Sequence, residues 1–251
     1  MTSTISYEKR RGEIETYFDR TAVDAWKRLT SDAPVGRIRA TVRAGRDHMR
    51  ATLLSWLPQD LRGLRLLDAG CGTGALATAA AHRGAEVVAI DLSPTLVGLA
   101  RERYSLEART APSNGGDITF LSGDMLDRSL GRFDYVVAMD SIIHYEAPDL
   151  IRVLEGLAAR ADRGVVFTFA PRTRMLGFMH AVGRFFPRGD RAPSIAPIAV
   201  DTVRQSIQKQ PGLAGWSEGR SERVARAFYI SQAFEITRTS AEPAVRARGQ
   251  S

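Results

Sequence analysis

Residues 66–77 read LLDAGCGTGALA, and this stretch decides the fold. Three alternating glycines, Gly70, Gly72 and Gly74, follow an apolar run and precede a series of small residues typical of a helix. Glycine allows the backbone to turn sharply and allows a ligand to approach it closely. The first turn of a helix has N–H groups without intrahelical partners. The stretch therefore predicts a strand, a tight glycine turn and a helix that together form a ligand site.

The residues around the glycines narrow the choice of ligand. Ala75 stands where the dinucleotide fingerprint has its third glycine, a tolerated variant, so spacing alone leaves NAD as an alternative. Asp68 lies just before the first glycine, where a carboxylate suits a cationic cofactor and disfavours a pyrophosphate. The whole stretch resembles motif I of the class I S-adenosylmethionine-dependent methyltransferases. This resemblance implies that Asp68, Gly70, Gly72 and Gly74 bind S-adenosylmethionine.

The composition indicates a globular protein of the cytoplasm. The 251 residues suffice for one large domain, and the hydrophobic (44%) and charged (25%) contents are ordinary for a soluble chain. No apolar run approaches the roughly 20 residues that span a bilayer, and the polar N-terminus predicts no secretory signal. The single cysteine, Cys71, fits a reducing compartment. The net charge of +7 comes from arginines spread along the chain without a basic run, so we expect no nucleic-acid partner.

Strand and helix patterns alternate after residue 60. The expected strands cover residues 65–69, 86–90, 117–121, 133–139, 164–169 and 227–233. The expected helices cover residues 74–82, 94–104 and 149–161. This alternation predicts an α/β fold, a doubly wound Rossmann-like methyltransferase sheet of parallel strands with helices on both faces. Ligands of such sheets bind beyond the carboxyl ends of the strands, so the residues that follow each strand are the candidates for the site.

Acidic residues follow three of the expected strands. Asp91 lies about 20 residues beyond the glycines, the distance expected for an acid that binds ribose hydroxyls. A helix N-cap is the alternative, but the serine two residues later is the better cap. The family resemblance places Asp124 against the adenine amino group and Met125 on the ring. Leu92 and Asp140, which also follow strands, complete the predicted cofactor-binding set.

Segments outside the alternation are additions to the core. Residues 1–60 have helical patterns and are predicted to form an N-terminal helical cap, the methyltransferase domain covers 61–236, and the polar residues 237–251 are predicted to be a disordered tail. Residues 172–215 form a predicted helical lid insertion. Its first part, 172–191, is expected to be an amphipathic helix with Met and Phe side chains and an arginine rim. A packed surface helix, a lid over an apolar substrate and a membrane-surface contact all fit this pattern.

Six segments together are similar to one methyltransferase family. They are residues 17–19 (YFD), 25–29 (AWKRL), 38–39 (IR), 140–145 (DSIIHY), 167–173 (FTFAPRT) and 228–229 (FY). These segments resemble the magnesium-protoporphyrin IX O-methyltransferases of the bacteriochlorophyll pathway, and the resemblance covers residues 17–236. Family members are expected to have a tyrosine where this chain has Thr30, and we take Tyr17 as its replacement.

The resemblance implies methyl transfer from S-adenosylmethionine to a propionate carboxylate of magnesium-protoporphyrin IX. His144 and Tyr17 are the predicted catalytic residues, and His144 is expected to hold the carboxylate, take a proton or ligate the porphyrin magnesium. Arg172 is expected to pair with the other propionate, because a guanidinium matches a carboxylate. Tyr145 and Phe185 are expected to contact the substrate. No Cys/His cluster has metal-binding spacing, so no protein-bound metal is predicted.

The family also implies partners beyond the substrate. A magnesium chelatase subunit is expected to contact the chain, and the basic amphipathic segment favours peripheral association with the inner face of the photosynthetic membrane. Two other functions stay open at this point. A methyltransferase acting on another apolar molecule such as a quinone would need a smaller pocket, and a non-catalytic regulator would bind S-adenosylmethionine without turnover.

Overall fold

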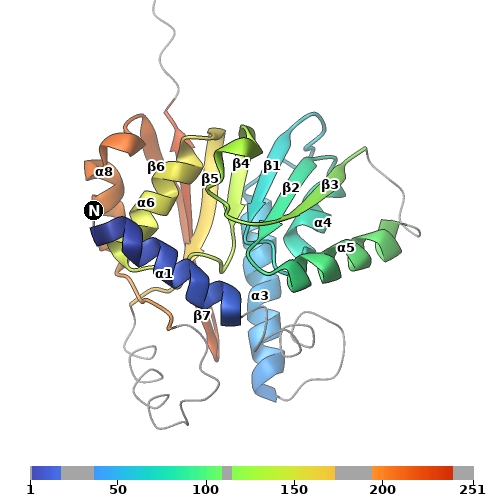
Figure 1. Cartoon of the computed structure of the whole chain (residues 1–251), viewed down its shortest axis with the longest axis horizontal. Coiled ribbons are helices and arrows are strands. Elements are labelled where there is room, and N and C mark those ends of the chain that lie inside the picture. The colour runs from blue at the N-terminus through green and yellow to red at the C-terminus, as the bar shows by residue number, and fades with distance from the viewer. Residues whose placement is uncertain (1, 18–36, 109–114, 173–193, 240–251) are drawn as a thin grey trace, which may run out of the picture.

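A computed structural model describes residues 2–17, 37–108, 115–172 and 194–239 of the chain. Its centre is a seven-stranded sheet with the order β3-β2-β1-β4-β5-β7-β6 (Figure 1). The strands are β1 (Arg65–Ala69), β2 (Glu86–Asp91), β3 (Asp117–Ser122), β4 (Phe133–Ala138), β5 (Ala161–Phe169), β6 (Trp216–Arg226) and β7 (Tyr229–Arg238). β1 pairs in parallel with β2 on one side and with β4 on the other. The strand order therefore reverses beside β1, and open α/β sheets bind their ligands at such a point.

Helices cover both faces of the sheet and bury two apolar cores. They are α1 (Thr2–Thr16), α3 (Arg37–Ser55), α4 (Ala75–Ala81), α5 (Pro94–Ala108), α6 (Ala147–Ala158) and α8 (Val200–Lys209). One core contains Ile14 of α1, Leu154 of α6 and Val203 of α8. The other contains Met49 of α3 and Val97 of α5, together with the small side chains of α4. The sheet is thus sandwiched between two helical layers, as a doubly wound fold requires.

Most of the predicted elements are confirmed. β1 has the predicted bounds, and β2 to β5 differ from the prediction by one to three residues at one end. The three predicted helices correspond to α4, α5 and α6, and the helical pattern of the first 60 residues corresponds to α1 and α3 in its described parts. These strands were predictable because each is a short run with buried apolar residues between turn residues: β1, β2, β4 and β5 are largely buried, and the edge strand β3 buries alternate residues.

The edge of the sheet corrects the prediction in three respects. β7 runs antiparallel to both β5 and β6, so the sheet is mixed and not parallel throughout. The expected strand 227–233 begins too early, because Ala227 and Phe228 form the turn between β6 and β7, with Ala227 at φ 48°. β7 then continues to Arg238, two residues into the predicted tail. β6 was not predicted, because its side chains are charged and mostly exposed and lack an apolar face.

The predicted lid insertion, 172–215, is described only in part. Its last part contains α8, which packs against α6, and a short 3-10 helix, Pro211–Leu213. Before them, Ile198 forms a parallel bridge with Pro171. Except for Arg172, the predicted amphipathic helix lies outside the described residues, as does the tail beyond residue 239. Among the helices that the structure describes, none combines the length and the apolar character needed to cross a bilayer.

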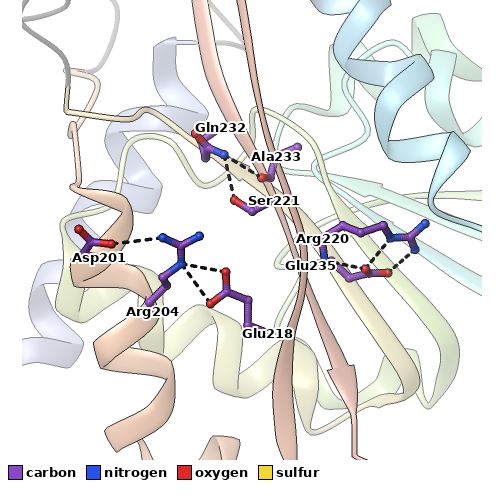
Figure 2. A network of polar contacts seen from close by, with 8 residues as sticks. All are labelled: Asp201, Arg204, Glu218, Arg220, Ser221, Gln232, Ala233 and Glu235. Atoms are coloured by element: carbon purple, nitrogen blue, oxygen red, sulfur yellow. Dashed lines mark hydrogen bonds and ion pairs between the residues drawn. The ribbon is translucent and has the colours of Figure 1, made fainter.

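Ion pairs join β6 to α8 on one side and to β7 on the other (Figure 2). Arg204 of α8 donates to the carboxylate of Glu218 on β6, with 2.8 Å between Nε and Oε1. Arg220 of β6 binds the buried carboxylate of Glu235 on β7, with 2.6 Å between Nη2 and Oε1. The same guanidinium donates to the carbonyl oxygen of Trp56 and lies over its ring at 5.3 Å. Because Trp56 directly follows α3, this contact anchors the carboxyl end of that helix to the sheet.

Candidate active site

A cavity of about 290 Å³ opens at the carboxyl edge of the sheet, beside the reversal in strand order. Its walls come from the glycine turn, the end of β2, the loops after β3 and β4, α1 and one face of α3. The lining residues include Asp68, Gly70, Gly72, Asp91, Leu92, Met125, Asp140, His144 and Tyr145, all of which are predicted site residues, as well as Ile14, Arg43, Arg46, Asp47, Arg50 and Ser141. The structure therefore gathers residues between Ile14 and Tyr145 around one space.

The glycine turn has the backbone conformation that three glycines permit. Gly70, Gly72 and Gly74 have φ values of 89°, 53° and 79°, in a region that other residues rarely adopt. A Cβ atom on Gly70 would overlap the side chain of Ser141 in the loop after β4. Gly74 does not line the cavity, and a Cβ atom there would lie 3.0 Å from the side chain of Ala100. Close packing of the turn thus requires glycine even before a ligand is considered.

Asp68 presents a buried carboxyl group to the cavity. It lies on β1 and is 1% exposed. Its Oδ2 accepts a hydrogen bond from the backbone N–H of Ala77 on α4 (3.1 Å). Burial raises the pKa of Asp68 to about 7, although the Ala77 N–H opposes the increase, and the negative charge of Asp91 raises it further. A cationic group in the cavity would favour the ionised form of this carboxyl.

Asp91, at the end of β2, forms a hydrogen bond with the backbone of the glycine turn. Its Oδ2 accepts a hydrogen bond from the N–H of Gly72 (2.8 Å), and its Oδ1 accepts one from the N–H of Ser93 (3.0 Å). The helix-capping role belongs to Ser93, whose Oγ accepts a hydrogen bond from the N–H of Leu96 (3.2 Å). A carboxylate has about four acceptor positions, so Asp91 retains acceptor capacity for ligand hydroxyls. Its ribose-binding role, and the cofactor contact of Leu92, stay predictions.

Asp124 has partners that the sequence analysis did not identify. The hydroxyl of Tyr7 donates to its Oδ1 (2.9 Å), and Arg11 donates to its Oδ2 (2.6 Å), so α1 engages both oxygens. Burial raises the pKa of the Tyr7 hydroxyl, and its ring stacks on Tyr145 with 5.3 Å between centroids. Asp124 does not line the cavity, whereas Met125 beside it does. α1 thus covers the loop after β3, and a contact between Asp124 and adenine stays a prediction.

Asp140 is the centre of a polar network at the end of β4. It has a positive φ of 54°, and its side chain is 6% exposed. Arg46 of α3 donates to its Oδ2 (2.6 Å), and the hydroxyl of Tyr229 on β7 donates to its Oδ1 (3.0 Å). The backbone N–H of Asp140 donates to Oγ1 of Thr168 on β5 (2.7 Å). These hydrogen bonds offset the cost of burying the Asp140 carboxylate and hold in place the loop that contains His144.

His144 is buried in the loop after β4, at 5% exposure, and lines the cavity. Its Nδ1 lies 3.4 Å from the carbonyl oxygen of Ser194. A carbonyl oxygen only accepts, so this contact assigns the ring proton to Nδ1 and the lone pair to Nε2 in the neutral imidazole. Tyr145 follows in sequence, and burial raises the pKa of its hydroxyl. The two residues are therefore neighbours on the same wall of the cavity.

Besides Gly74 and Asp124, three predicted site residues are not placed in the cavity. Arg172 is exposed, and its backbone N–H donates to the carbonyl oxygen of Ile198 (2.9 Å). Tyr17 is half-buried and does not line the cavity. Phe185 lies outside the described residues, as does Thr30. The roles given to these residues stay predictions. Within the described ranges, no group of three or more His, Cys, Asp or Glu residues is arranged to hold a metal ion.

The sequence analysis missed the contribution of α3 to the cavity. Arg43, Arg46, Asp47 and Arg50 all line it. Their spacing of three, four and seven residues places them on one helical face. That spacing was visible in the sequence, but only the packing of α3 shows that this face meets the cavity and not solvent.

The comparisons with known proteins agree on one family. The model "Magnesium-protoporphyrin IX methyltransferase C-terminus" matches residues 138–238, and a methyltransferase domain model matches residues 66–164. The chain is 48% identical over 230 residues to the magnesium-protoporphyrin O-methyltransferase of Rhodobacter capsulatus, covering 91% of this chain and 97% of that protein. The chain belongs to the magnesium-protoporphyrin O-methyltransferase family.

Two further matches support the family across the full chain. The magnesium-protoporphyrin O-methyltransferase of Synechocystis sp. is 31% identical and covers 90% of this chain and 95% of that protein. The crystal structure of magnesium protoporphyrin IX methyltransferase from Synechocystis with bound SAH has a TM-score of 0.77 at 28% identity, covering 90% of this chain and 98% of that one. The family and the methyltransferase fold predicted from the sequence are thus confirmed. The C-terminal family match includes the loop with Asp140 and His144 and ends with β7.

Proposed function

We propose that this member of the family transfers a methyl group from S-adenosylmethionine to a propionate carboxylate of magnesium-protoporphyrin IX, in bacteriochlorophyll biosynthesis. The products are the monomethyl ester and S-adenosylhomocysteine. The observation that carries the proposal is the 48% identity to the Rhodobacter capsulatus enzyme over nearly the whole of both chains. The cavity supports it, because it combines a glycine turn, buried acids and a buried histidine at the carboxyl edge of the sheet.

Methyl transfer to a carboxylate requires little acid–base catalysis by the protein. A carboxylate has an ordinary pKa of about 4 and is ionised at neutral pH. One of its oxygens attacks the methyl carbon, a new O–C bond forms, and the C–S bond breaks with its electron pair returning to sulfur. No proton moves in this step, so alignment of the reactants and exclusion of water provide most of the acceleration.

We expect the cofactor and the acceptor to contact different walls of the cavity. The glycine turn allows close approach of a ligand, and Asp68 and Asp91 add negative charge on that side. A sulfonium ion is positively charged, so these two acids favour S-adenosylmethionine over its neutral thioether product. The acceptor then lies toward the loop after β4, where His144 and Tyr145 line the cavity.

The hydrogen bonding of His144 favours one of its three predicted roles. The contact between Nδ1 and the Ser194 carbonyl oxygen favours the neutral tautomer with its proton on Nδ1 and its lone pair on Nε2. A neutral Nε2 without a proton cannot donate to a carboxylate, and the carboxylate needs no base. We therefore favour His144 as the ligand that holds the magnesium of the porphyrin.

Radiolabelled methyl transfer tests the function directly. The purified chain should transfer label from S-adenosylmethionine to magnesium-protoporphyrin IX, should transfer less to metal-free protoporphyrin IX, and should transfer none to the magnesium dimethyl ester. Asp60→Asn, at an exposed residue outside the cavity, is the control variant and should retain full activity. Absence of transfer to magnesium-protoporphyrin IX, with S-adenosylmethionine still bound, would contradict the proposal.

We also propose that the chain acts in the cytoplasm at the inner face of the photosynthetic membrane and receives its substrate from a magnesium chelatase subunit. The net charge of +7 and the apolar substrate support a peripheral membrane contact. Sedimentation with anionic vesicles should show binding that weakens as salt screens the charges, with neutral vesicles as the control. Adding chelatase subunits should lower the KM for the porphyrin. No binding at low salt and no change in KM would contradict these two contacts.

A further inference from the structure

The two sides of the cavity carry opposite charge. Asp68 and Asp91 lie on the side of the glycine turn. Arg43, Arg46 and Arg50 line the cavity from α3, and Asp47 and Asp140 line it beside them, so this side has three guanidinium groups against two carboxylates and keeps an excess of positive charge. An anionic group would be repelled by the acids and attracted by the arginines, because low-dielectric walls strengthen such interactions. The face of α3 is therefore the part of the cavity that suits a negatively charged group.

α3 is held rigidly enough to position these side chains. A Cβ atom on Gly45 would lie only 2.6 Å from the ring of Tyr229, so the helix backbone packs directly on β7 at this point. Met49 and Leu53 of the same helix are fully buried. At its carboxyl end, α3 is anchored through Trp56 as described above. A binding group on a helix that is fixed by the core is placed more precisely than one on a loop.

The charge pairs along α3 distinguish the three arginines that line the cavity. Arg50 donates to Asp47 of the same helix (2.9 Å), in an exposed pair. Arg46 is 19% exposed and is oriented by the buried carboxylate of Asp140. A guanidinium has five N–H donors, so Arg46 can hold Asp140 and a ligand oxygen together. Arg43 lies one turn before Arg46 on the same cavity-lining face.

We propose that Arg43 and Arg46 of α3 bind a carboxylate of a ligand in this cavity. The inference rests on the proposed function, in which both reactants carry such a group. The methionyl end of S-adenosylmethionine has a carboxylate, and magnesium-protoporphyrin IX has a second propionate beside the one that is methylated. Paired guanidinium groups match the planar geometry of a carboxylate and provide charge-assisted hydrogen bonds. The two possible sources share this chemistry and differ in which molecule loses affinity when the arginines are changed.

Arg43→Gln is the main test variant, because it removes one charge without touching the Asp140 network. Arg39→Gln is its matched control: Arg39 is on the same helix, one turn earlier, is exposed and does not line the cavity. Arg46→Lys keeps a charge near Asp140 but loses the planar fork. Each variant is first compared with the unmodified chain by thermal unfolding and circular dichroism.

Four titrations on each variant identify the carboxylate. Calorimetry measures S-adenosylhomocysteine and methylthioadenosine, which lacks the amino-acid carboxylate. Porphyrin fluorescence measures magnesium-protoporphyrin IX and its dimethyl ester. If the cofactor supplies the carboxylate, Arg43→Gln and Arg46→Lys weaken S-adenosylhomocysteine about tenfold or more and leave methylthioadenosine unchanged. If the acceptor supplies it, they weaken the diacid and leave the dimethyl ester unchanged.

Two outcomes would overturn the inference. In one, both variants match Arg39→Gln in every titration. In the other, affinity falls equally for each ligand and for its analogue without the carboxylate, so that the arginines act only on the general shape of the cavity. Neither outcome depends on turnover, and methyl transfer by the unmodified chain is measured separately. Failure of this inference is therefore distinguishable from failure of the proposed function.

Discussion

Replacing Asp68 with asparagine should make the ligand-free protein more stable at neutral and alkaline pH. Asp68 is buried on β1, and its carboxyl accepts a hydrogen bond from the N–H of Ala77. This bond does not offset the loss of water, and burial raises the pKa to about 7 from an ordinary 3.8. An amide side chain has nearly the same shape, can accept the same hydrogen bond and carries no charge to desolvate.

The sign and size of the effect follow from this pKa. Between pH 4 and 7 the folded chain keeps a proton on Asp68 that the unfolded chain has lost, so stability falls as the pH rises. The slope is about 1.4 kcal/mol per pH unit, and over about 3 units the total reaches at most about 4 kcal/mol. Asp68→Asn removes this loss. The variant should equal the unmodified chain near pH 4 and should exceed it increasingly up to pH 7 and above.

Urea unfolding at pH 5, 6, 7 and 8, without S-adenosylmethionine, measures the difference. Asp60→Asn is the matched control, because Asp60 is exposed and its hydrogen bonds with Arg62 lower its pKa to about 2. Asp60 is thus ionised throughout this pH range in both states, and the control should leave the slope of stability against pH unchanged. The same slope in Asp68→Asn and in the unmodified chain would refute the assignment of a raised pKa to Asp68.

Ligand binding provides a second measurement on the same carboxyl. A sulfonium ion in the cavity favours the ionised form of Asp68, so binding of S-adenosylmethionine near pH 6 should release a proton. Calorimetry in two buffers with different ionisation enthalpies detects that proton. Asp68→Asn should bind S-adenosylmethionine more weakly and should release less, because only Asp91, whose pKa is also raised by burial, remains to lose a proton. The more stable variant would then be the poorer binder, as expected where a site retains a costly buried charge.

Three further substitutions test other walls of the cavity. Gly70→Ala places a Cβ atom against Ser141 at a φ of 89°. We therefore expect the free energy of unfolding in urea to fall by about 1–3 kcal/mol and calorimetry to show weaker binding of S-adenosylhomocysteine; unchanged affinity would make the turn structural only. His144→Ala should lower single-turnover methyl transfer about 100-fold, because a misplaced acceptor loses its alignment with the methyl group, and should reduce the preference for magnesium over metal-free porphyrin; a normal rate would remove His144 from the acceptor site. Arg11→Ala removes the 2.6 Å contact with Asp124, so α1 should become more accessible to protease in the ligand-free chain; equal cleavage rates would show that this contact does not hold α1 in place.

The buried part of the fold was predictable from local patterns. β1, β2, β4 and β5 are short apolar runs that are largely buried in the sheet, and β3 at the edge buries alternate residues, Ile118 and Phe120. The turn residues between them, above all the three glycines at 70, 72 and 74, place the boundaries. β6 was not predicted because it is a charged strand at the edge of the sheet. Its strand conformation depends on hydrogen bonds to β7 and on ion pairs such as that between Arg204 and Glu218. β7 in turn is held by pairing with β5, which lies much earlier in the chain.

The same distinction applies to the site. Asp68, Asp91, Asp140 and His144 were candidates because each lies in or just after a strand, and the carboxyl ends of parallel strands meet at one edge of the sheet. Chain order alone is enough for that inference. The partners of these residues were not predictable. No local pattern indicates that Tyr229 of β7 would bind Asp140, because the two residues meet only when the last hairpin closes the sheet.

The sequence by itself thus determined the family, the apolar runs that form the strands and the acidic residues that follow those strands. Each of these features depends on residues close together in the chain. Only the tertiary structure decided which residues and surfaces α1 and α3 contact. Packing brings Arg11 onto Asp124 across 113 residues and directs Arg43 and Arg46 into the cavity. A helix with polar residues on one face is compatible with solvent or with a binding site, and only the surface against which its apolar face packs decides between them.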